Sequence, residues 1–321
     1  MIRFSAIIPV YNRPEEINEL LQSFVDQTEP FYEVIIVEDG SSITCEEIVK
    51  SYAGQLNIQY LFKENSGQGF SRNYGFERAK GDYFLVFDSD CILPADYLDN
   101  VRYSIEKNRF DAFGGPDQSM DSFTPIQKAI SYSMTSVFTT GGIRGNKKHA
   151  GHFHPRSFNM GISSNVFQST DGYKITRMGE DIEFSIRIIE SGFKVGLIEE
   201  AFVYHKRRTS FIQFFKQLRF FGRARINVSR FYPSEIKVIH LLPAGFLFAL
   251  VFWLFTPLIN LELFYFGAWA NTAFIILIFL HASKECGSIY VGLLSVIASY
   301  IQLLAYGTGL ITEGIKKFIS G

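Results

Sequence analysis

The sequence predicts an α/β domain with a Rossmann-like sheet, followed by helices that enter a membrane. Short apolar runs alternate with helical segments in units of roughly thirty residues, a pattern typical of parallel βαβ crossovers. Acidic residues directly follow two of these runs, at Glu38-Asp39 and at Asp88. The chain carries many charges up to about Tyr232 and almost none from Leu241 onward. These observations predict a globular part and a separate membrane part.

The composition disfavours several classes of protein. With 47% hydrophobic residues, 33 Phe and 16 Tyr, the 321-residue chain is more apolar and aromatic than a soluble enzyme needs. Its net charge of -1 gives no electrostatic reason to expect a nucleic-acid partner. Cys45, Cys91 and Cys286 lie far apart without a CxxC pair, which disfavours a disulfide framework and a zinc site and fits a reducing compartment.

The first half of the chain contains three predicted strands before the central one. The apolar run Phe4–Val10 predicts a buried strand; it is too short for a signal peptide and is broken by Pro9, so we expect the part that follows to stay in the cytoplasm. Pro14 suits the first turn of a helix that runs to about Gln27. No GxGxxG follows the first strand and no GxxxxGK[ST] exists, which disfavours NAD and P-loop chemistry. Further strands are predicted at Val34–Val37 and Ile58–Phe62, and a helix that opens within Asn65–Asn73 runs to about Lys80.

Two carboxylates follow the predicted central strand Tyr83–Phe87, which lies between Gly81 and Pro94. Asp88 and Asp90 stand just past its C-terminal end, the edge where open α/β sheets bind ligands. Side chains at i and i+2 of an extended segment point the same way, so this pair could hold one Mg²⁺ or Mn²⁺. The alternative is a solvated turn, the commoner setting for an acidic pair taken alone.

A second acidic pair, Glu180-Asp181, opens a predicted helix that continues through Arg187. Negative charge at a helix N-terminus is common and contributes about 0.3–1 kcal/mol, so the pair alone also has a purely structural explanation. The neighbouring pattern predicts a helix at Ala95–Lys107, an extended segment at Ala112–Gly115 and strands at Phe158–Ser163, Lys194–Ile198 and Ala201–His205.

The segment Thr139–Pro155 is rich in glycine and in basic residues. Its three histidines could ligate a metal, but their spacing does not place them on one helical face, so a flexible loop over the active site is the favoured interpretation. The basic residues and histidines are Arg144, Lys147, Lys148, His149, His152 and His154.

The C-terminal third predicts contact with a membrane. In Thr209–Tyr232 aromatic residues recur at helical spacing among lysines and arginines, as in an amphipathic helix lying in a membrane interface. Three uncharged segments follow, each about long enough to cross a hydrocarbon core of roughly 30 Å. These segments are Leu241–Ile259, Leu263–Leu280 and Ile289–Ile311.

Charge also predicts the orientation of the membrane part. The many Lys and Arg residues before Leu241 place the large domain in the cytoplasm by the positive-inside rule. An odd number of spans would then put Lys316 and Lys317 outside. Either the third segment is re-entrant or the count of three is off by one.

The motifs resemble those of the family 2 glycosyltransferases over about residues 1–210. Each motif is weak alone, but their combination in this order is specific. The resemblance implies the GT-A fold, with a Rossmann-like mixed sheet, and transfer of a sugar from a nucleotide-diphosphate donor with inversion. The motifs are Ile7-Ile8-Pro9-Val10-Tyr11-Asn12, Glu38-Asp39-Gly40-Ser41, Asn73 with Ala79-Lys80-Gly81-Asp82, Asp88-Ser89-Asp90 and Glu180-Asp181.

The resemblance implies a set of donor-binding residues. Pro9, Tyr11 and Asp39 would contact the base and the ribose. Arg72 or Asn73 would lie near the diphosphate. We therefore expect a nucleotide-sugar donor, UDP-linked in the leading interpretation, at this edge of the sheet.

It also implies a metal site and a catalytic base. Asp90 would ligate Mn²⁺ or Mg²⁺, and Asp88 would face the donor sugar or ribose beside the same metal. His205 would be a further ligand, or would instead cap a helix or stack on a ring. Asp181, paired in sequence with Glu180, would be the base. The expected acceptor region is Asn159, Met160 and Gly161.

Together these expectations describe a metal-dependent inverting glycosyltransferase anchored in the cytoplasmic membrane, with its catalytic domain facing the cytoplasm and a lipid-linked or cell-envelope glycan as acceptor. The expected domains are residues 1–208 (catalytic), 209–238 (interfacial helix) and 239–321 (transmembrane). A nucleotidyltransferase is one alternative, although it would need no base at Asp181. A non-catalytic envelope-assembly scaffold is another, although it would need neither acidic pair.

Overall fold

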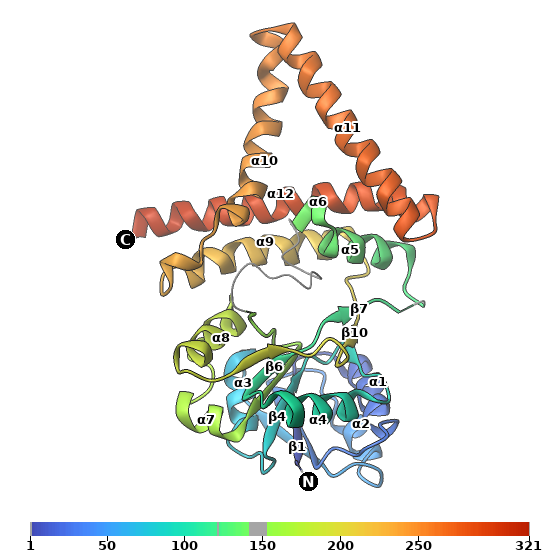
Figure 1. Ribbon diagram of the computed structural model, residues 1–321, viewed down its shortest axis with the longest axis vertical. Helices are drawn as coiled ribbons and strands as arrows, with labels where there is room; N and C mark the ends of the chain where they lie inside the picture. The colour runs from blue at the N-terminus through green and yellow to red at the C-terminus, as the bar shows by residue number, and fades with distance from the viewer. Residues whose placement is uncertain (1, 121, 141–152, 321) are drawn as a thin grey trace. The chain divides into compact units, whose positions relative to one another are not determined.

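The computed structural model describes all residues except 1, 121, 141–152 and 321 (Figure 1). The chain forms two compact units. Unit 1 comprises Met1–Gln118 and Ala150–Lys206, and unit 2 comprises Ser119–His149 and Arg207–Gly321. This division differs from the expected continuous domain 1–208, because a segment from its middle belongs with the C-terminal helices. The expected basic loop, with Arg144, Lys147, Lys148, His149 and His152, lies outside the described residues.

Unit 1 is built on a seven-stranded mixed sheet in the order β3-β2-β1-β4-β8-β6-β9, which confirms the predicted fold class. Strands β1 to β4 run parallel, and β8 runs antiparallel to both β4 and β6. A second sheet of three short strands has the order β5-β10-β7. The strands are β1 (Phe4–Val10), β2 (Glu33–Asp39), β3 (Ile58–Lys63), β4 (Tyr83–Phe87), β5 (Cys91–Ile92), β6 (Ala112–Gly114), β7 (Asp117–Gln118), β8 (Asn159–Ser163), β9 (Val195–Leu197) and β10 (Val203–His205).

Helices cover both faces of the large sheet (Figure 1). Pro14 starts α1 as predicted, and the buried side chains of this helix recur at helical spacing, at Ile17, Leu20, Leu21 and Phe24. Two helices, α2 and α7, were not predicted. The helices of unit 1 are α1 (Pro14–Val25), α2 (Glu46–Ser51), α3 (Gln68–Phe76), α4 (Tyr97–Asn108), α7 (Ser164–Thr170) and α8 (Glu180–Glu190).

The alternation of side chains along β1 divides the core into two layers. Phe4, Ala6 and Ile8 belong to one cluster and Ile7 to the other, because successive side chains of a strand point to opposite faces. Both faces are covered, which explains why the run Phe4–Val10 is apolar except at Ser5 rather than alternating. Full burial of each large aliphatic side chain contributes roughly 1.5–3 kcal/mol, so β1 anchors the sheet.

Unit 2 is entirely helical in its described residues. Three of its helices are long and apolar enough to cross a membrane, over Val238–Leu258, Leu261–Glu285 and Ile289–Ile319. Thr124 begins α5 with a capping box to Gln127. The elements are α5 (Pro125–Thr135), α6 (Val137–Thr140), α9 (Phe211–Val228), η1 (Pro233–Glu235), α10 (Val238–Phe255), η2 (Thr256–Leu258), α11 (Leu261–Glu285) and α12 (Ile289–Ser320).

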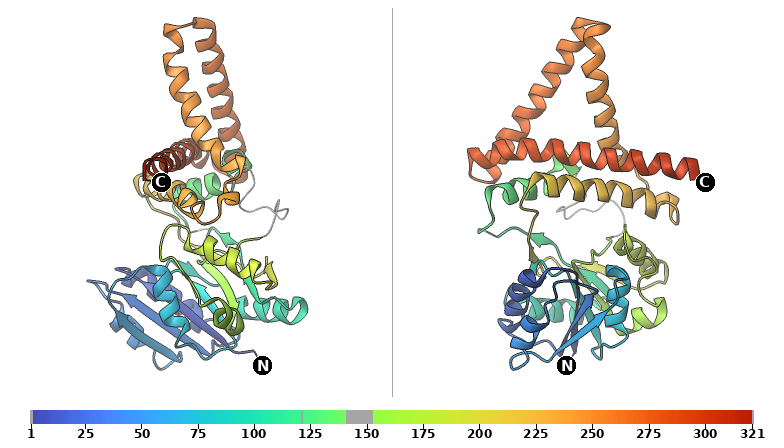
Figure 2. Two further views of the ribbon diagram at one scale, coloured as in Figure 1. Left: turned by 90° about the vertical axis from the view of Figure 1, so that its left-hand side faces the viewer. Right: turned by 180° about the vertical axis from the view of Figure 1, so that it is seen from behind.

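The amphipathic helix predicted within Thr209–Tyr232 is α9, and its apolar face is covered by protein. Phe214 and Leu218 pack in one cluster with Ala298 and Ala305 of α12. Figure 2 shows α9 and α12 side by side along much of their length. The apolar spacing that predicted a membrane-facing surface therefore serves first to hold α12.

Candidate active site

The carboxyl ends of β1, β2 and β4 meet at one edge of the sheet because the three strands are parallel neighbours. Loops carrying Tyr11 and Asp88 leave the sheet there, and Asp39 is the last residue of β2. β8 runs the opposite way, so its first residue, Asn159, lies at the same edge. His205 arrives from β10, which pairs with β5 directly after the acidic turn, with His205 opposite Cys91.

Asp90 is the centre of one polar group at this edge. Asp90 is 4% exposed, and its carboxylate lies between two basic side chains: Arg13 Nη1 donates to Oδ2 at 3.0 Å, and His205 Nε2 lies 3.1 Å from Oδ1. The imidazole of His205 stacks on the ring of Phe158 with centroids 5.0 Å apart, which fixes its orientation. Arg13 also bonds Glu16 at 2.9 Å, so this guanidinium joins α1 to the acidic turn.

This group has donor atoms that suit a divalent cation. Asp90, Cys91 and His205 each offer a ligand atom, and these atoms lie within 4.8 Å of one another. Burial raises the pKa of the Cys91 thiol well above its usual value, and its Sγ lies 3.5 Å from the carbonyl oxygen of Phe158. The carboxylate of Asp90 and the imidazole of His205 are the pair that fits Mn²⁺ or Mg²⁺, because these ions bind soft sulfur ligands poorly.

Asp88 belongs to a different group. Arg72 on α3 is 1% exposed and donates to Asp88 Oδ1 at 2.9 Å and to Glu180 Oε1 at 3.2 Å. The guanidinium also lies over the ring of Tyr173, 5.4 Å from its centroid. A buried cation that faces two carboxylates is largely neutralised by them, which ties the turn after β4 to the start of α8.

That Asp88 and Asp90 act together on one metal stays a prediction, and the two carboxylates have different partners in this structure. Residues 88–90 form a turn rather than an extended segment, so the two side chains do not point the same way. Asp88 turns towards Arg72, whereas Asp90 turns towards His205. Asp88 is accordingly outside the group of candidate ligands found among the described residues.

Glu180 and Asp181 differ sharply in their surroundings. Glu180 is 4% exposed and is held by Arg72 and by Gln68, whose amide donates to the same oxygen. Burial, followed by the charge of Asp181, raises the pKa of Glu180. The side chain of Asp181 is 20% exposed, with Oδ2 lying 3.4 Å from Arg156 Nη1 and Oδ1 accepting from the amide of Ile182. Of the two, Asp181 is the one that a substrate could reach.

Asp39 forms a third group at the end of β2. Its carboxylate accepts from Lys63 Nζ at 2.7 Å and from the backbone amides of Ser66 and Gly67, both at 2.9 Å. Burial opposes ionisation, but Lys63 and the backbone donors outweigh it, so the pKa of Asp39 lies below its usual value. This keeps the loop that leads into α3 close to β2.

Of the remaining donor-side candidates, Tyr11 is 52% exposed and stands at the open edge, whereas Pro9 is half-buried within β1 and pairs with Val37 of β2. The loops after β1 and β2 are joined by Asn12, whose side-chain oxygen accepts from the amides of Ser42 and Ile43 at 2.9 and 3.1 Å. Tyr11 is thus carried on a loop that hydrogen bonds keep in place.

Asn73 does not join these groups. Its amide nitrogen donates to the carbonyl of Tyr173 and its oxygen accepts from the amide of Tyr173, both at 2.8 Å. Both polar atoms of its side chain therefore hold the loop before α8. Of the two residues expected near the diphosphate, Arg72 contacts Asp88 in the acidic turn, whereas Asn73 makes a structural contact with Tyr173.

The role of the expected acceptor region stays a prediction, and its three residues are buried in a strand. Asn159, Met160 and Gly161 lie in β8, which pairs with β4 on one side and β6 on the other, and all three are buried. Asn159 bonds the hydroxyl of Tyr97 at 2.6 Å and the carbonyl of Ala201 at 2.8 Å. These residues support the sheet, and none of them is open to an acceptor in this structure.

Four residues at the site were not singled out from the sequence: Arg13, Lys63, Gln68 and Arg156. Each pairs with a predicted carboxylate, at Asp90, Asp39, Glu180 and Asp181 respectively. Arg13 and Lys63 stand at or just after the ends of predicted strands, a position that could have indicated them. Gln68 and Arg156 carry no such local signal.

Comparisons with known proteins concern the sequence and the fold of the chain. The family model described as glycosyl transferase family 2 matches residues 5–167. The minor teichoic acid biosynthesis protein GgaB of Bacillus subtilis (strain 168) is 29% identical over 210 residues, which cover 64% of this chain and 23% of GgaB. The poly(ribitol-phosphate) beta-N-acetylglucosaminyltransferase TarS of Staphylococcus aureus (strain Mu50) is 33% identical over 166 residues, 46% of this chain and 29% of TarS. The matched region thus spans less than a third of either relative.

Two further proteins match over most of the chain. A dolichyl N-acetyl-alpha-D-glucosaminyl phosphate 3-beta-D-2,3-diacetamido-2,3-dideoxy-beta-D-glucuronosyltransferase of Methanococcus voltae is 26% identical over 272 residues, 79% of this chain and 82% of the relative. The solved structure of the mannosyltransferase PcManGT from Pyrobaculum calidifontis, in complex with GDP-Man and Mn²⁺, has a TM-score of 0.61 at 16% identity. It covers 99% of this chain and 88% of that one. This second likeness is one of fold.

Proposed function

The chain belongs to glycosyltransferase family 2, and we propose that it is a membrane-anchored, metal-dependent inverting enzyme that transfers a sugar from a nucleotide-diphosphate donor to a lipid-linked or cell-envelope glycan. The observation that carries this proposal is the joining of both acidic motifs at one sheet edge: Arg72 bonds Asp88 at 2.9 Å and Glu180 at 3.2 Å. A donor-binding turn and the helix that carries a base are thereby held together.

The donor half of the proposal rests on the loops after β1 and β2. Tyr11 offers an exposed ring on which a base can stack, and Asp39 an ionised carboxylate that can accept from ribose hydroxyls. Pro9 shapes the strand end beneath them. We take UDP as the leading nucleotide, with the diphosphate directed towards the acidic turn, where Arg13 supplies a partly exposed cation.

Asp90 and His205 would hold the metal, since an oxygen and an imidazole nitrogen 3.1 Å apart match the ligand preference of Mn²⁺ and are acceptable to Mg²⁺. PcManGT, which has the same fold, was solved with Mn²⁺. When bound, such a cation neutralises negative charge on the departing diphosphate. Arg13, which pairs with Asp90 here, adds positive charge on the same side of the reacting centre.

Asp181 is proposed as the general base. The acceptor hydroxyl gives its proton to the Asp181 carboxylate, the hydroxyl oxygen bonds to the sugar C1, and the bond from C1 to the diphosphate oxygen breaks. Attack opposite the leaving group, without a covalent enzyme intermediate, inverts the anomeric configuration. Arg156 positions Asp181 from the side, and Glu180, locked by Arg72 and Gln68, fixes the first turn of α8.

The proposed acceptor class is supported by the membrane helices and by the names of the relatives. Three described helices are apolar enough to cross a bilayer, which would confine the enzyme to a surface where lipid-linked sugars are concentrated. The M. voltae relative is named for transfer to a dolichyl-phosphate-linked sugar, and GgaB for teichoic acid synthesis. A lipid-linked or envelope glycan at the cytoplasmic membrane fits both.

A donor screen tests the proposal. The full chain, purified in detergent, is incubated with UDP- and GDP-linked sugars, Mn²⁺ or Mg²⁺ and a polyprenyl-phosphate-sugar acceptor, and nucleoside diphosphate release is measured. We expect one donor to give release that an Asp90→Asn variant lacks, and NMR of the product to show the inverted anomer. Release that is equal in the variant, or a retained anomer, would overturn the proposal.

A further inference from the structure

The composition of α12 suits a membrane span, but that of its neighbour α9 does not. From Ile289 to Thr312 the sequence of α12 contains no charged residue, whereas α9 carries four cations within its 18 residues. Each Lys or Arg at the centre of a crossing helix costs about 2.5–3.5 kcal/mol, so α9 cannot cross the hydrocarbon core. These cations are Lys216, Arg219, Arg223 and Arg225.

The backbones of α9 and α12 touch where glycines allow it. A Cβ added to Gly222 would lie 2.1 Å from the carbonyl oxygen of Tyr306, and one added to Gly309 would lie 2.0 Å from that of Arg219. Small residues are typical of helices that approach this closely. The two helices are therefore bound directly to each other at this point.

Polar contacts extend this pairing towards the C-terminus. Glu313 of α12 is 9% exposed and lies 3.0 Å from Arg223 Nε and 3.6 Å from Arg230 Nη2. Lys317 Nζ donates to the carbonyl and the hydroxyl of Ser229, at 3.2 and 3.1 Å. A carboxylate with two guanidinium partners fixes the register between the helices.

The contacts also show that α9 and α12 run in the same direction side by side, so that the two helices lie at the same depth. Phe214 and Leu218 pack with Ala298 and Ala305, and further along Ile226 packs with Leu310. If α12 crossed the bilayer, it would draw the cations of α9 into the hydrocarbon with it. The exposed apolar side chains in the uncharged part of α12 need only lie shallowly in the membrane; they are Ile289, Tyr290, Leu293 and Ile297.

The helices α10 and α11 differ from α12 in the cations near them and in how much of their surface is buried. No Lys or Arg lies between Lys237 and Lys284. Most side chains of the two helices are exposed, and only 11% and 6% of their most apolar stretches are buried. Figure 2 shows the two helices leading away from α12 and meeting at a tip, where Glu262 is the charged residue. Trp253 and Phe264 stack near this tip, with centroids 5.5 Å apart.

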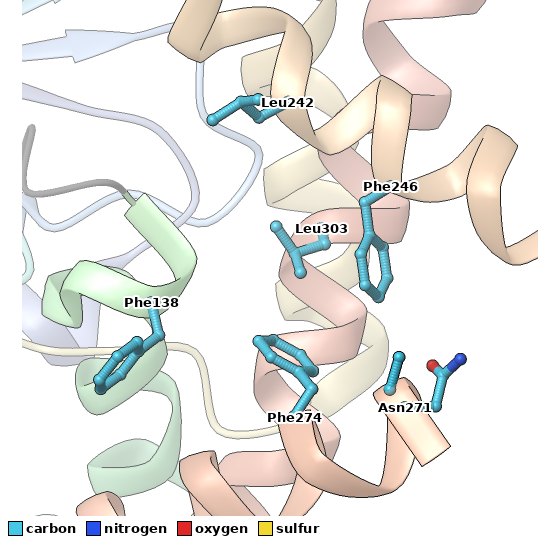
Figure 3. Close-up of a pocket in the computed structure, with 7 residues that line it drawn as sticks. Phe138, Leu242, Phe246, Asn271, Phe274 and Leu303 are labelled. Carbon is cyan, nitrogen blue, oxygen red and sulfur yellow. The ribbon is translucent and has the colours of Figure 1, made fainter. Parts of the chain in front are cut away.

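Nearer α12 the same two helices diverge and leave a cavity of about 350 Å³ between them, shown in Figure 3. Six of its seven lining residues are apolar, as expected of a space within the hydrocarbon region. The lining residues are Phe138, Leu242, Phe246, Ala270, Asn271, Phe274 and Leu303.

We propose that α10 and α11 alone cross the bilayer, as a hairpin, and that α12 lies with α9 in the membrane interface, where their cations contact anionic lipid headgroups. Two crossings return the chain to the side from which it entered. Lys237, Lys284, Lys316 and Lys317 then all face the cytoplasm with the catalytic unit, as the positive-inside rule requires. This removes the conflict that three spans create, and it does not depend on the reaction proposed above.

Cysteine labelling tests the proposal. Cys45 and Cys91 are buried, so Cys286→Ser gives a background for the single changes I212C on α9, E262C at the tip and F318C at the end of α12, all at exposed positions. The full chain is expressed in bacterial cells, and a membrane-impermeant maleimide is applied to spheroplasts and to inverted vesicles.

We expect F318C and I212C to be labelled in inverted vesicles and E262C in spheroplasts. Labelling of F318C together with E262C would show three crossings, and labelling of all three on one side would show none; either result overturns the proposal. Labelling after detergent solubilisation confirms that each cysteine is reactive. A cysteine that is labelled only after solubilisation lies in the hydrocarbon, and this result would also overturn the proposal.

Depth along α12 provides an independent measurement. Fluorophores on I289C, I297C and I315C, all on exposed positions, are quenched by lipids brominated at one acyl position. An in-plane helix gives the same loss of fluorescence at all three. A crossing helix advances about 1.5 Å per residue, so its quenching would rise and fall along the series.

Discussion

His205 Nε2 lies 3.1 Å from Asp90 Oδ1, and the stacking of its ring on Phe158 holds it there. The two residues come from distant parts of the chain and meet because β10 pairs with β5 directly after the acidic turn. This contact makes the small three-stranded sheet part of the candidate metal site.

Replacing either residue of this pair should abolish metal-dependent donor binding. With Asp90→Asn or His205→Gln, the remaining ligand cannot hold a cation against water, and the diphosphate is left unneutralised. Calorimetric titration with donor and Mn²⁺ measures the effect, with Asp171→Asn, an exposed carboxylate paired to Lys174, as the control. Wild-type affinity in both site variants would mean that the pair is only structural.

Asp181→Asn should keep donor affinity and lower turnover by roughly 10²–10⁴, the range typical of the loss of a general base. Glu180→Gln, in contrast to Asp181→Asn, should lower thermal stability, because Glu180 bonds buried Arg72 and Gln68. Donor titration, initial rates and melting curves separate the two variants. If Asp181→Asn loses donor affinity and turnover equally, Asp181 belongs to the donor site.

Arg72→Met should destabilise unit 1 by about 3–5 kcal/mol, because it leaves Asp88 and Glu180 without their shared cation. Lys50→Met is the control: Lys50 is an exposed partner of Glu46 and Glu47, and such surface pairs contribute about 0–1 kcal/mol. Denaturant unfolding of the two variants gives the comparison. Equal losses would show that the burial of Arg72 has no energetic importance.

The stabilisation provided by Asp39 should disappear in acid. Its pKa is lower in the folded chain than in the unfolded chain, so the contribution is complete above the unfolded value of about 3.9 and is lost as the pH falls through the folded value. Melting temperatures between about pH 3 and pH 7 should therefore depend less on pH in Asp39→Asn than in the wild type. Glu47→Gln, at an exposed position, should keep the wild-type profile.

Gly309→Ala should weaken the contact between α9 and α12, whereas Gly314→Ala should not. The new methyl group at 309 would lie 2.0 Å from the carbonyl oxygen of Arg219, but at 314 the nearest atom is 4.0 Å away. Overpacking of this kind costs about 1–3 kcal/mol. Thermal denaturation in detergent compares the two, and equal melting temperatures would mean that the helices separate easily.

The sequence predicted the sheet well because its strands are buried on both faces. β4 is apolar throughout, and β1 and β2 each contain a mostly apolar run, a clear pattern that a buried strand leaves. The helices α2 and α7 were missed because they have six and seven residues, too few to show a helical period. α5 was missed because its partners, on α9 and α12, lie far along the chain.

At the site, the sequence identified the carboxylates but not what faces them. Asp39, Asp88, Asp90 and Asp181 all stand at strand or helix ends, positions that a local pattern can mark. The residue that each one bonds is set by tertiary structure, as when Arg156 reaches Asp181. Asn159 is a polar residue at the end of a strand, where a local pattern suggests exposure. It is nevertheless buried, and its side chain bonds Tyr97 and Ala201.

The grouping of α5 with the C-terminal helices has a consequence for how the protein is made. Ala129, Ile130 and Met134 of α5 pack with Val291 of α12, yet on the ribosome α5 is completed before β8 and long before α12. Until α12 has been synthesised, the apolar side of α5 lacks the part of its cover that α12 provides. The packing of α5, from the middle of the chain, is therefore completed only when α12 has been made. A nascent chain that stops before α12 exposes this surface of α5 to chaperones or to the lipid.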